Sequence, residues 1–311
     1  MKAKNTNRNQ YLRVAAAVVA IAGASAVMAQ PQQDFSAVEI KTHELADGVY
    51  YLEGSGGNIG VSIGEDGVFL IDDQYAPLSE KIIAAVKALS DKPIRFVFNT
   101  HHHGDHTGGN INFGKGGAIL VSHENARTRI AAGFTGADLA KALTDDQKAG
   151  LPVITFEDSV NFHLNGHDIH AQHVVPAHTD GDSIIVFKDI NLIHTGDVFR
   201  TVAYPRADAP GGGSLLGILA VYEQLIEMSD ANTRFLPGHG VVSTRADVES
   251  QLKMLTTIRD RVQSGITAGK TVEQIQAEKP TAEFDAQWSG GNATAGDALV
   301  AVYFTELSAK K

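Results

Sequence analysis

The chain of 311 residues is 43% apolar, contains no cysteine, and carries a formal charge of −10 at pH 7. The lack of cysteine excludes disulfides, a thiolate metal ligand and a lipid-modified cysteine near the N-terminus. The acidic balance, without a run of basic residues in the body of the chain, argues against a nucleic-acid partner, because such binding depends on Lys and Arg at the phosphates.

The first 29 residues have the pattern of a secretory signal peptide. Four cations and no acid open the chain, an alanine-rich apolar stretch covers residues 14–27, and small residues precede Gln30 at the −1 and −3 positions. About fourteen weakly apolar residues are too few to span a membrane, so no anchor should remain after cleavage. We expect an exported protein, periplasmic or secreted, whose mature chain begins at Gln30, with cleavage after Ala26 as the alternative. The mature charge is near −14, because cleavage removes Lys2, Lys4, Arg8 and Arg13.

The body of the chain, residues 30–311, fits one large α/β domain. Short apolar stretches rich in β-branched and aromatic residues are typical of buried strands, and a 3.6-residue apolar period is typical of amphipathic helices. Glu65-Asp66-Gly67 and Asn165-Gly166 are turn sequences, and they predict two hairpins. We predict strands at residues 49–52, 59–63, 68–72, 94–99, 118–121, 160–164, 168–173, 184–187 and 192–194, and helices at 78–89, 126–143 (interrupted at 133–136), 215–228 and 247–262, with a helical tail at 271–307.

A dense set of metal-ligand side chains follows the predicted strand at residues 94–99. His101, His103, Asp105 and His106 lie within six positions, and the glycines among and after them predict that this segment is a loop. Imidazole nitrogen with carboxylate oxygen is a ligand mixture that suits zinc, with iron and manganese as competitors. A solvated, histidine-rich turn is the alternative, but four such residues at this spacing favour a built metal site.

Three more ligand-type residues stand where later predicted strands end. His178 follows the strand at 168–173, Asp197 follows 192–194 in a glycine turn, and His239 lies in Pro237-Gly238-His239-Gly240. In layered α/β folds, sites are built where strands end at one edge of a sheet. We therefore expect these side chains to meet the first cluster.

Along the chain, the motif H-x-H-x-D-H is followed by His178, then by Asp197, and then by Pro237-Gly238-His239-Gly240. This order resembles the pattern of the metallo-β-lactamase superfamily over roughly residues 45–240. The resemblance implies a single αββα sandwich, in which two mixed β-sheets lie face to face with helices on the outer faces. It also implies two metal ions per chain, with zinc expected first. His101, His103 and His178 would bind one ion, Asp105, His106 and His239 would bind the other, and Asp197 would bridge them.

The resemblance implies a mechanism as well, in which the two ions share a water molecule and make it a hydroxide near neutral pH. This hydroxide would attack the substrate, and Asp105 is the candidate catalytic residue that orients it and carries its proton. His102 occupies a motif position that holds no metal, so we expect its side chain to point away. Asp72 ends a predicted strand at the same edge, and it is a candidate to hydrogen-bond a ligand imidazole, with turn capping as the alternative.

Loops at the metal edge are expected to form the substrate pocket. Asn58 ends the glycine-rich loop at 54–58, which we expect to be mobile, and Tyr204 and Arg206 lie in the loop at 199–213. Tyr204 would either donate a hydrogen bond to a developing oxyanion or close the pocket. Arg206 would either meet a substrate carboxylate or remain solvated.

The expected substrate class follows from a position at which this chain differs from other members of the family. Zinc β-lactamases carry Cys or Ser where this chain has Asp197, whereas a bridging Asp is similar to thioesterases of the glyoxalase II type, lactonases and phosphodiesterases. Export to a thiol-poor compartment disfavours glutathione thioesters, so the expected reaction is hydrolysis of a small-molecule β-lactam or lactone ring. The alternatives are a glyoxalase II-type thioesterase, a phosphodiesterase, a mononuclear iron sulfur dioxygenase, and a non-catalytic periplasmic zinc-binding protein. The oligomeric state is left open.

Overall fold

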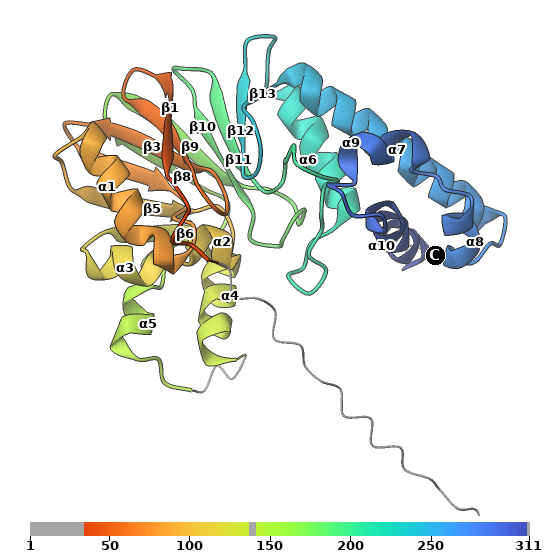
Figure 1. Ribbon diagram of the computed structural model, residues 1–311, viewed down its shortest axis with the longest axis horizontal. Coiled ribbons are helices and arrows are strands. Elements are labelled where there is room, and N and C mark those ends of the chain that lie inside the picture. The colour runs from red at the N-terminus through yellow and green to blue at the C-terminus, as the bar shows by residue number, and fades with distance from the viewer. Residues whose placement is uncertain (1–33, 137–140, 310–311) are drawn as a thin grey trace, which may run out of the picture. The chain divides into compact units, whose positions relative to one another are not determined.

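The computed structural model describes residues 34–136 and 141–309, so the predicted signal peptide and its cleavage sites lie outside the described residues. From residue 35 onward, the described chain forms one unit built on two β-sheets (Figure 1). None of the helices in this part of the chain is long and apolar enough to cross a membrane.

The first sheet contains seven strands in sequence order. Its first four strands form an antiparallel meander, and β4 to β7 run parallel to one another. The parallel part brings the carboxyl ends of β4, β5 and β6 to one edge, where the site is built. The strands are β1 (Lys41–Ala46), β2 (Val49–Glu53), β3 (Ile59–Gly64), β4 (Gly67–Ile71), β5 (Ile94–Asn99), β6 (Ile119–His123) and β7 (Ile154–Phe156).

The second sheet has six strands in the order β13-β12-β11-β10-β9-β8. Only β11 and β12 run parallel, and the hairpin between β8 and β9 turns at Asn165 and Gly166, both with positive φ, as the Asn-Gly pair predicts. The strands are β8 (Ser159–Leu164), β9 (His167–His173), β10 (Ser183–Phe187), β11 (Leu192–Gly196), β12 (Arg234–Pro237) and β13 (Ser243–Thr244).

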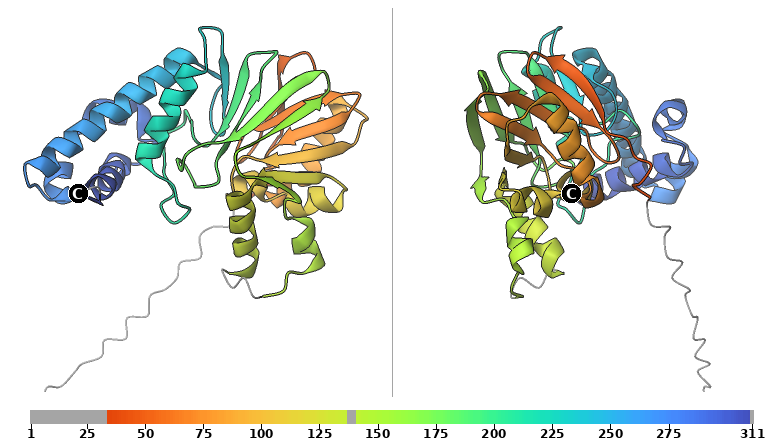
Figure 2. Two further views of the ribbon diagram at one scale, coloured as in Figure 1. Left: turned by 180° about the vertical axis from the view of Figure 1, so that it is seen from behind. Right: turned by 60° about the vertical axis from the view of Figure 1, so that its left-hand side comes forward.

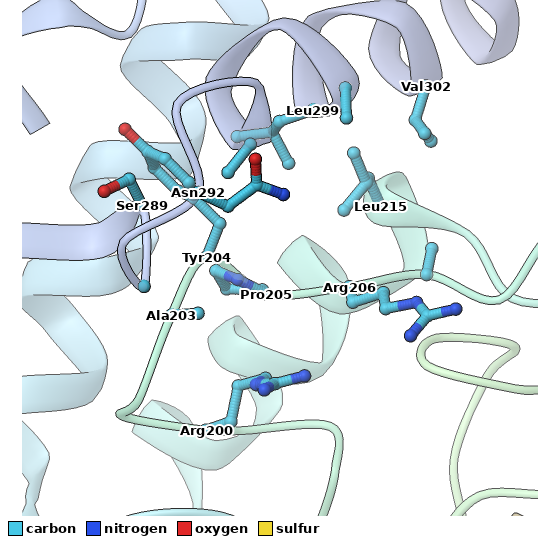
Figure 3. A pocket seen from close by; sticks show the side chains of 14 residues that line it. Arg200, Ala203, Tyr204, Pro205, Arg206, Leu215, Ser289, Asn292, Leu299 and Val302 are labelled. Atoms are coloured by element: carbon cyan, nitrogen blue, oxygen red, sulfur yellow. The ribbon is translucent and has the colours of Figure 1, made fainter. Parts of the chain in front are cut away.

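Helices cover the outer face of each sheet, and the two sheets pack face to face, which gives the expected αββα sandwich (Figure 2). The C-terminal helix α10 packs against α6 and α7, and together with residues 200–207 it lines a pocket (Figure 3). The helices are α1 (Ser79–Leu89), α2 (Gly104–Thr107), α3 (Asn110–Lys115), α4 (Glu124–Thr135), α5 (Asp145–Ala149), α6 (Leu215–Glu227), α7 (Arg245–Thr267), α8 (Val272–Ala277), α9 (Ala282–Trp288) and α10 (Ala295–Ala309).

The layers explain why the central strands are apolar at every position. In β4, Phe69 and Ile71 pack between the two sheets, whereas Val68 and Leu70 pack in the cluster that contains residues of α1. Successive side chains of a strand point to opposite faces, so a strand covered on both faces needs apolar residues on both. This double burial holds the site-bearing strand ends in fixed positions.

The glycine-rich segment after β5 is a loop only over residues 101–103, because α2 covers Gly104–Thr107 and α3 begins at Asn110, so the prediction of a loop was wrong for that part. Gly108 and Gly109 have helical backbone angles and begin no left-handed turn. Their role is close packing, because a Cβ on Gly108 would lie 2.5 Å from the backbone oxygen of Gly104, and one on Gly109 would lie 2.9 Å from that of Asp73. The helix predicted at 126–143 ends earlier, at Thr135, where Gly136 adopts a left-handed cap.

Candidate metal centre

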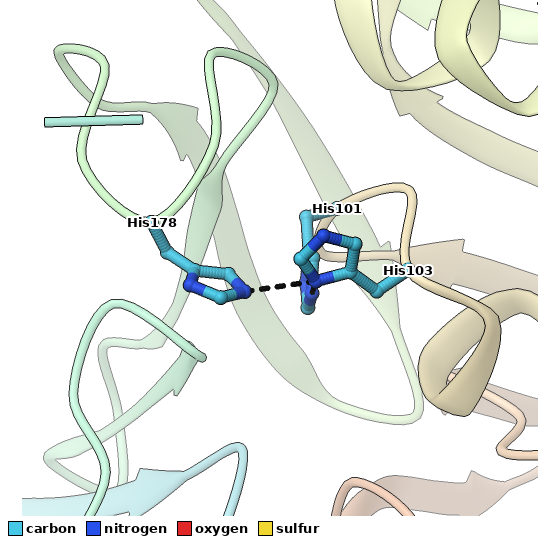
Figure 4. A group of neighbouring side chains, drawn as sticks. All are labelled: His101, His103 and His178. Carbon is cyan, nitrogen blue, oxygen red and sulfur yellow. Dashed lines mark hydrogen bonds between the residues drawn. The ribbon is translucent and has the colours of Figure 1, made fainter. Parts of the chain in front are cut away.

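The seven predicted ligand side chains come together at the edge where β5, β11 and β12 end and where the β9–β10 connection passes. His101, His103 and His178 form one set, here called the three-histidine group (Figure 4). His178 Nε2 lies 2.9 Å from His103 Nδ1, and His101 Nε2 lies 3.1 Å from the same atom. The three ring nitrogens therefore point at one small volume.

Asp105, His106 and His239 form the second set, here called the aspartate group. Asp105 Oδ2 lies 3.1 Å from His239 Nε2 and 3.7 Å from His106 Nε2. The single turn of α2 positions the consecutive residues Asp105 and His106, and His239 follows the end of β12. The group thus joins the two halves of the sandwich.

Asp197 lies between the two groups. Its Oδ1 is 3.2 Å from His106 Nε2, and its Oδ2 is 3.6 Å from His178 Nε2 and 3.4 Å from His239 Nε2. The carboxylate reaches this place because β11 ends at Gly196, whose φ of 51° bends the chain inward. One carboxylate therefore faces both groups, as a bridging ligand must.

The rings of His178 and His103 each make a hydrogen bond on the side that faces away from the other rings of the group. This bond fixes which of the two ring nitrogens faces the group without a proton. His178 Nδ1 donates to the backbone oxygen of Arg206 at 2.6 Å, and His103 Nε2 donates to Asp208 Oδ2 at 2.9 Å. A neutral imidazole carries one N–H, so the inward nitrogens of both rings carry lone pairs.

Thr100 and Asp72 fix the rings of His101 and His106 in the same way. The Thr100 hydroxyl donates to Asp72 Oδ2 at 2.8 Å, so it accepts from His101 Nδ1 at 3.0 Å. Asp72 Oδ2 also accepts from His106 Nδ1 at 2.7 Å. The buried Asp72 therefore orients one ring of each group, one directly and one through Thr100, which is the contact that its strand-end position predicted.

This arrangement fits a pair of divalent metal ions. Inward lone pairs 2.9 and 3.1 Å apart repel one another unless a cation lies among them. Asp197 Oδ1 is buried and makes no hydrogen bond within the described residues, although His106 Nε2 is near it. Each group offers three imidazole or carboxylate donors, and the carboxylate of Asp197 is shared between the groups. Zinc accepts such a ligand set, and a zinc ion with so few protein ligands keeps a coordination position free for a substrate.

Burial and charge affect the two groups differently. Burial lowers the pKa of His101 well below its usual value and lowers that of His178 to about 4. Burial also acts to lower the pKa of His239, but hydrogen bonds to Asp105 and Asp197 outweigh it and raise this pKa to about 9. His101 and His178 are therefore neutral at pH 7, whereas the aspartate group attracts a proton when no metal ion competes for it.

Two glycines allow the chain to pass close to the ligands. A Cβ on Gly57 would lie 2.2 Å from His106 Cε1, and one on Gly238 would lie 2.0 Å from Asp197 Oδ1. Both distances are far shorter than a carbon van der Waals contact. Any other residue at either position would push a ligand out of place.

Asn58 does not form a wall of the pocket, and this expectation is corrected. Its side-chain amide donates to the backbone oxygens of Pro237 and Gly240, both at 2.9 Å, and the residue is buried. The loop at 54–58 is pinned in place, because Gly57 N–H donates to the backbone oxygen of Asp105. Asn58 therefore ties the His239 segment to the first half of the fold.

Tyr204 lines a pocket together with Arg206, but it is not placed as an oxyanion donor. Its hydroxyl donates to Asp285 Oδ1 at 2.8 Å, and its side chain is buried against the C-terminal helices. Arg206 is exposed, and its side chain lies in the pocket beside α10. His102 belongs to neither ligand group, and its Nε2 lies 3.9 Å from Asp208 Oδ2.

Sequence reasoning missed Thr100, Asp208 and the backbone oxygen of Arg206, which orient three of the ligand rings. Thr100 directly precedes the motif, and that adjacency is a usable signal. Asp208 lies 105 positions from the ring that it contacts, in a segment without periodicity. Its role depends on the path of the loop after β11.

The sequence is similar to those of known proteins. A family model described as the metallo-β-lactamase superfamily matches residues 52–239. The hydroxyacylglutathione hydrolase of Nitrosococcus oceani is 30% identical over 167 residues, or 52% of this chain and 55% of that protein, so the match spans about half of that relative.

Two solved structures have a similar fold. A metallo-β-lactamase from Pontibacter korlensis matches with a TM-score of 0.58 and 15% identity, and the match covers 70% of this chain and 99% of that one. The DIM-1 metallo-β-lactamase matches with a TM-score of 0.58 and 13% identity, and the match covers 71% of this chain and 99% of that one. At these identities the likeness concerns the fold alone.

Proposed function

Because the chain belongs to the metallo-β-lactamase superfamily, we propose that it is an exported hydrolase that holds two zinc ions and cleaves an acyl centre, with a β-lactam or lactone ring as the preferred substrate. The observation that carries this proposal is the convergence of seven ligand side chains in two groups around Asp197. A site that only stores one ion has no use for a second group or a shared carboxylate.

When bound, the two ions would polarise the substrate oxygen and lower the pKa of a water molecule. Asp105 is the residue best placed to orient that water, because its carboxylate is partly exposed, with 25% of the side chain accessible. Burial acts to raise its pKa, but the hydrogen bond from His239 outweighs burial and lowers it to about 2. Asp105 is thus ionised at neutral pH and accepts a proton or a hydrogen bond.

A thioesterase is the second candidate function, and two observations favour it. The curated relative is named a hydroxyacylglutathione hydrolase, and Asp197 stands where zinc β-lactamases carry Cys or Ser. Export disfavours glutathione thioesters, so a thioesterase of this kind would act on other thioesters or inside the cell. The two candidates share the site and differ only in the acyl leaving group.

Export is part of the proposal, and it rests on the composition of residues 1–29. The mature protein recovered from its native host should begin at or near Gln30. N-terminal sequencing or intact-mass analysis checks this, and a mature protein that retains Met1 would contradict it.

The activity is tested with zinc-loaded protein and a panel of nitrocefin, lactones, thioesters and bis-(p-nitrophenyl) phosphate. Turnover of nitrocefin or a lactone supports the proposal, and turnover of thioesters alone supports the second candidate. Turnover of the phosphodiester alone contradicts both. A single bound iron with oxygen consumption would identify a sulfur dioxygenase, and tight metal binding without turnover would identify a zinc-binding protein.

A further inference from the structure

The loop at residues 208–213, here called the Asp208 loop, lies against the outer side of the three-histidine group. Asp208 Oδ2 accepts from His103 Nε2 at 2.9 Å, and the Asp208 N–H donates to the backbone oxygen of His178 at 2.8 Å. The loop forms no helix or strand, and residues 211–213 are three consecutive glycines. Glycine gives a backbone the most conformational freedom. Asp208 therefore keeps its place beside His103 only if other segments hold the loop.

Arg129 of α4 holds this loop from outside the metal centre. Its Nε donates to Asp180 Oδ1 at 2.6 Å, and its Nη2 donates to Asp180 Oδ2 at 2.5 Å. Its Nη1 donates to the backbone oxygen of Pro210 at 3.1 Å. A guanidinium has a planar set of donors that can bind a carboxylate with two parallel bonds and still reach a third acceptor. One side chain thus ties α4 to the β9–β10 connection and to the Asp208 loop.

The backbone is shaped to fit this ion pair. The Asp180 N–H donates to the backbone oxygen of Gly211 at 2.9 Å, and Asn125 Nδ2 donates to the backbone oxygen of Asp180 at 2.8 Å. Gly212 has a φ of 77°, and a Cβ there would lie 2.7 Å from Asp180 Oδ2. Only glycine combines that backbone angle with so close an approach. The Asp208 loop is therefore packed directly on the carboxylate that Arg129 binds.

The two contacts of Arg129 lie next to the parts of the chain that set the histidine rings. Asp180 is two residues after His178, and Pro210 is two residues after Asp208. Isolated ion pairs on a protein surface contribute little, but a bidentate pair with restricted solvent access is an exception. The side chains of Arg129 and Asp180 are 28% and 26% accessible. A displacement of either contact would be passed over two residues to a ligand ring or to its acceptor.

We propose that Arg129 is a positioning residue for the three-histidine group: through Asp180 and Pro210 it holds Asp208 against His103, and it thereby raises the zinc affinity of that group. The inference rests on the metal centre of the proposed function. It adds a determinant of affinity that the ligand sets do not contain, because the described hydrogen bonds of Arg129 reach no ligand side chain.

Zinc affinity, measured by competition with a chromophoric chelator, tests the proposal without turnover. Arg129→Met should weaken zinc binding at the three-histidine group about tenfold, which is the lower end of the loss expected behind a metal ligand. Arg261→Met is the matched control, because Arg261 binds the carboxylate of Glu283 and the backbone oxygen of Pro280, both at 2.6 Å, away from the metal centre. This control should keep full affinity. Equal affinities for the two variants would overturn the proposal.

A double-mutant cycle separates positioning from a general structural role. Asp208→Ala removes the acceptor through which Arg129 acts, so the addition of Arg129→Met should weaken zinc binding less than about twofold further. A residue that merely stabilises the fold would act independently, and the two losses would then multiply. A further loss of about tenfold in the double variant would therefore overturn the proposal.

Amide hydrogen exchange, measured with and without zinc, reports on the loop itself. In Arg129→Met the amides of Asp208 and Gly213 should exchange about tenfold faster, whereas those of β10 should not change. Asp180→Asn should give the same pattern, because it weakens the other side of the ion pair. An equal increase in β10, or none in the loop, would overturn the proposal. If the unaltered protein binds no zinc, the proposed function fails, and exchange in the metal-free protein still decides whether Arg129 holds the loop.

Discussion

The three-histidine group and the aspartate group share Asp197 but prepare for a metal ion in different ways. In the first, outer hydrogen bonds to Arg206, Asp208 and Thr100 fix each ring with its lone pair inward. In the second, the carboxylate of Asp105 draws a proton onto His239 that the metal must displace. The comparison teaches that one ion enters a set in which the rings of His101 and His178 are already neutral, whereas the other must compete with a proton on His239. We therefore expect the three-histidine group to fill first at neutral pH.

Replacement of Asp105 should give the largest effect on catalysis. Asp105→Ala removes both a ligand of the aspartate group and the side chain that orients the attacking water, so kcat should fall by about three orders of magnitude or more. Steady-state kinetics on the active substrate measure this. His102→Ala is the internal control, because His102 belongs to neither group and its loss should leave metal binding intact. Near-normal turnover of Asp105→Ala would contradict the assigned role.

Replacement of Asp208 should affect the three-histidine group selectively. Asp208→Ala removes the acceptor that fixes His103, and zinc affinity should fall about 10–100-fold. Competition with a chromophoric chelator measures the affinity. Asp189→Ala is the matched control, because it breaks a similar carboxylate–imidazole contact, to His167 at 2.6 Å, away from the site. Equal affinities for the two variants would mean that Asp208 does not orient the ligand.

The pH dependence of zinc binding should separate the groups. The pKa of His239 is raised to about 9, so its ring holds a proton at pH 7, and binding at the aspartate group should strengthen about tenfold per pH unit for each displaced proton up to about pH 9. His101 and His178 have lowered pKa values and are already neutral over this range. Calorimetry in buffers of different ionisation enthalpy counts the released protons. Equal proton release on zinc binding at both groups would contradict the difference between the three-histidine group and the aspartate group.

The smallest catalytic effect is expected for Tyr204, which lies outside both groups. Tyr204→Phe removes a hydrogen bond to Asp285 and should lower the free energy of unfolding by about 1 kcal/mol. Its kcat should change less than about twofold, because the hydroxyl does not face the ligands. Chemical denaturation and kinetics on the same preparation give both numbers. A large loss of kcat at unchanged stability would restore the expectation that Tyr204 serves the reaction directly.

Much of the fold could be predicted because local patterns determine it. The apolar runs of β4 and β5 and the Asn165-Gly166 turn give strand positions to within a residue or two. The candidate ligand residues were visible in the sequence because four of them are nearly contiguous and the other three follow strand ends. The assembly of the two groups follows from the sandwich, which brings those ends to one edge.

The parts that could not be predicted depend on contacts between distant segments. Asn58 and Tyr204 are polar residues in loops and look available in the sequence, but the fold uses both in hydrogen bonds to other segments. Asp208 has no local pattern, and only the path of its loop brings it to His103. The helical turn α2 was hidden because Gly104 and Gly108 suggest a loop, whereas close packing is what requires Gly108.

Metal content tests the central claim most directly, since the account rests on two groups around one carboxylate. Zinc-loaded, gel-filtered protein should contain two zinc ions per chain by elemental analysis, and His239→Ala should retain one with lost activity. A single ion in the unaltered protein, together with full activity of His239→Ala, would contradict the shared site built around Asp197.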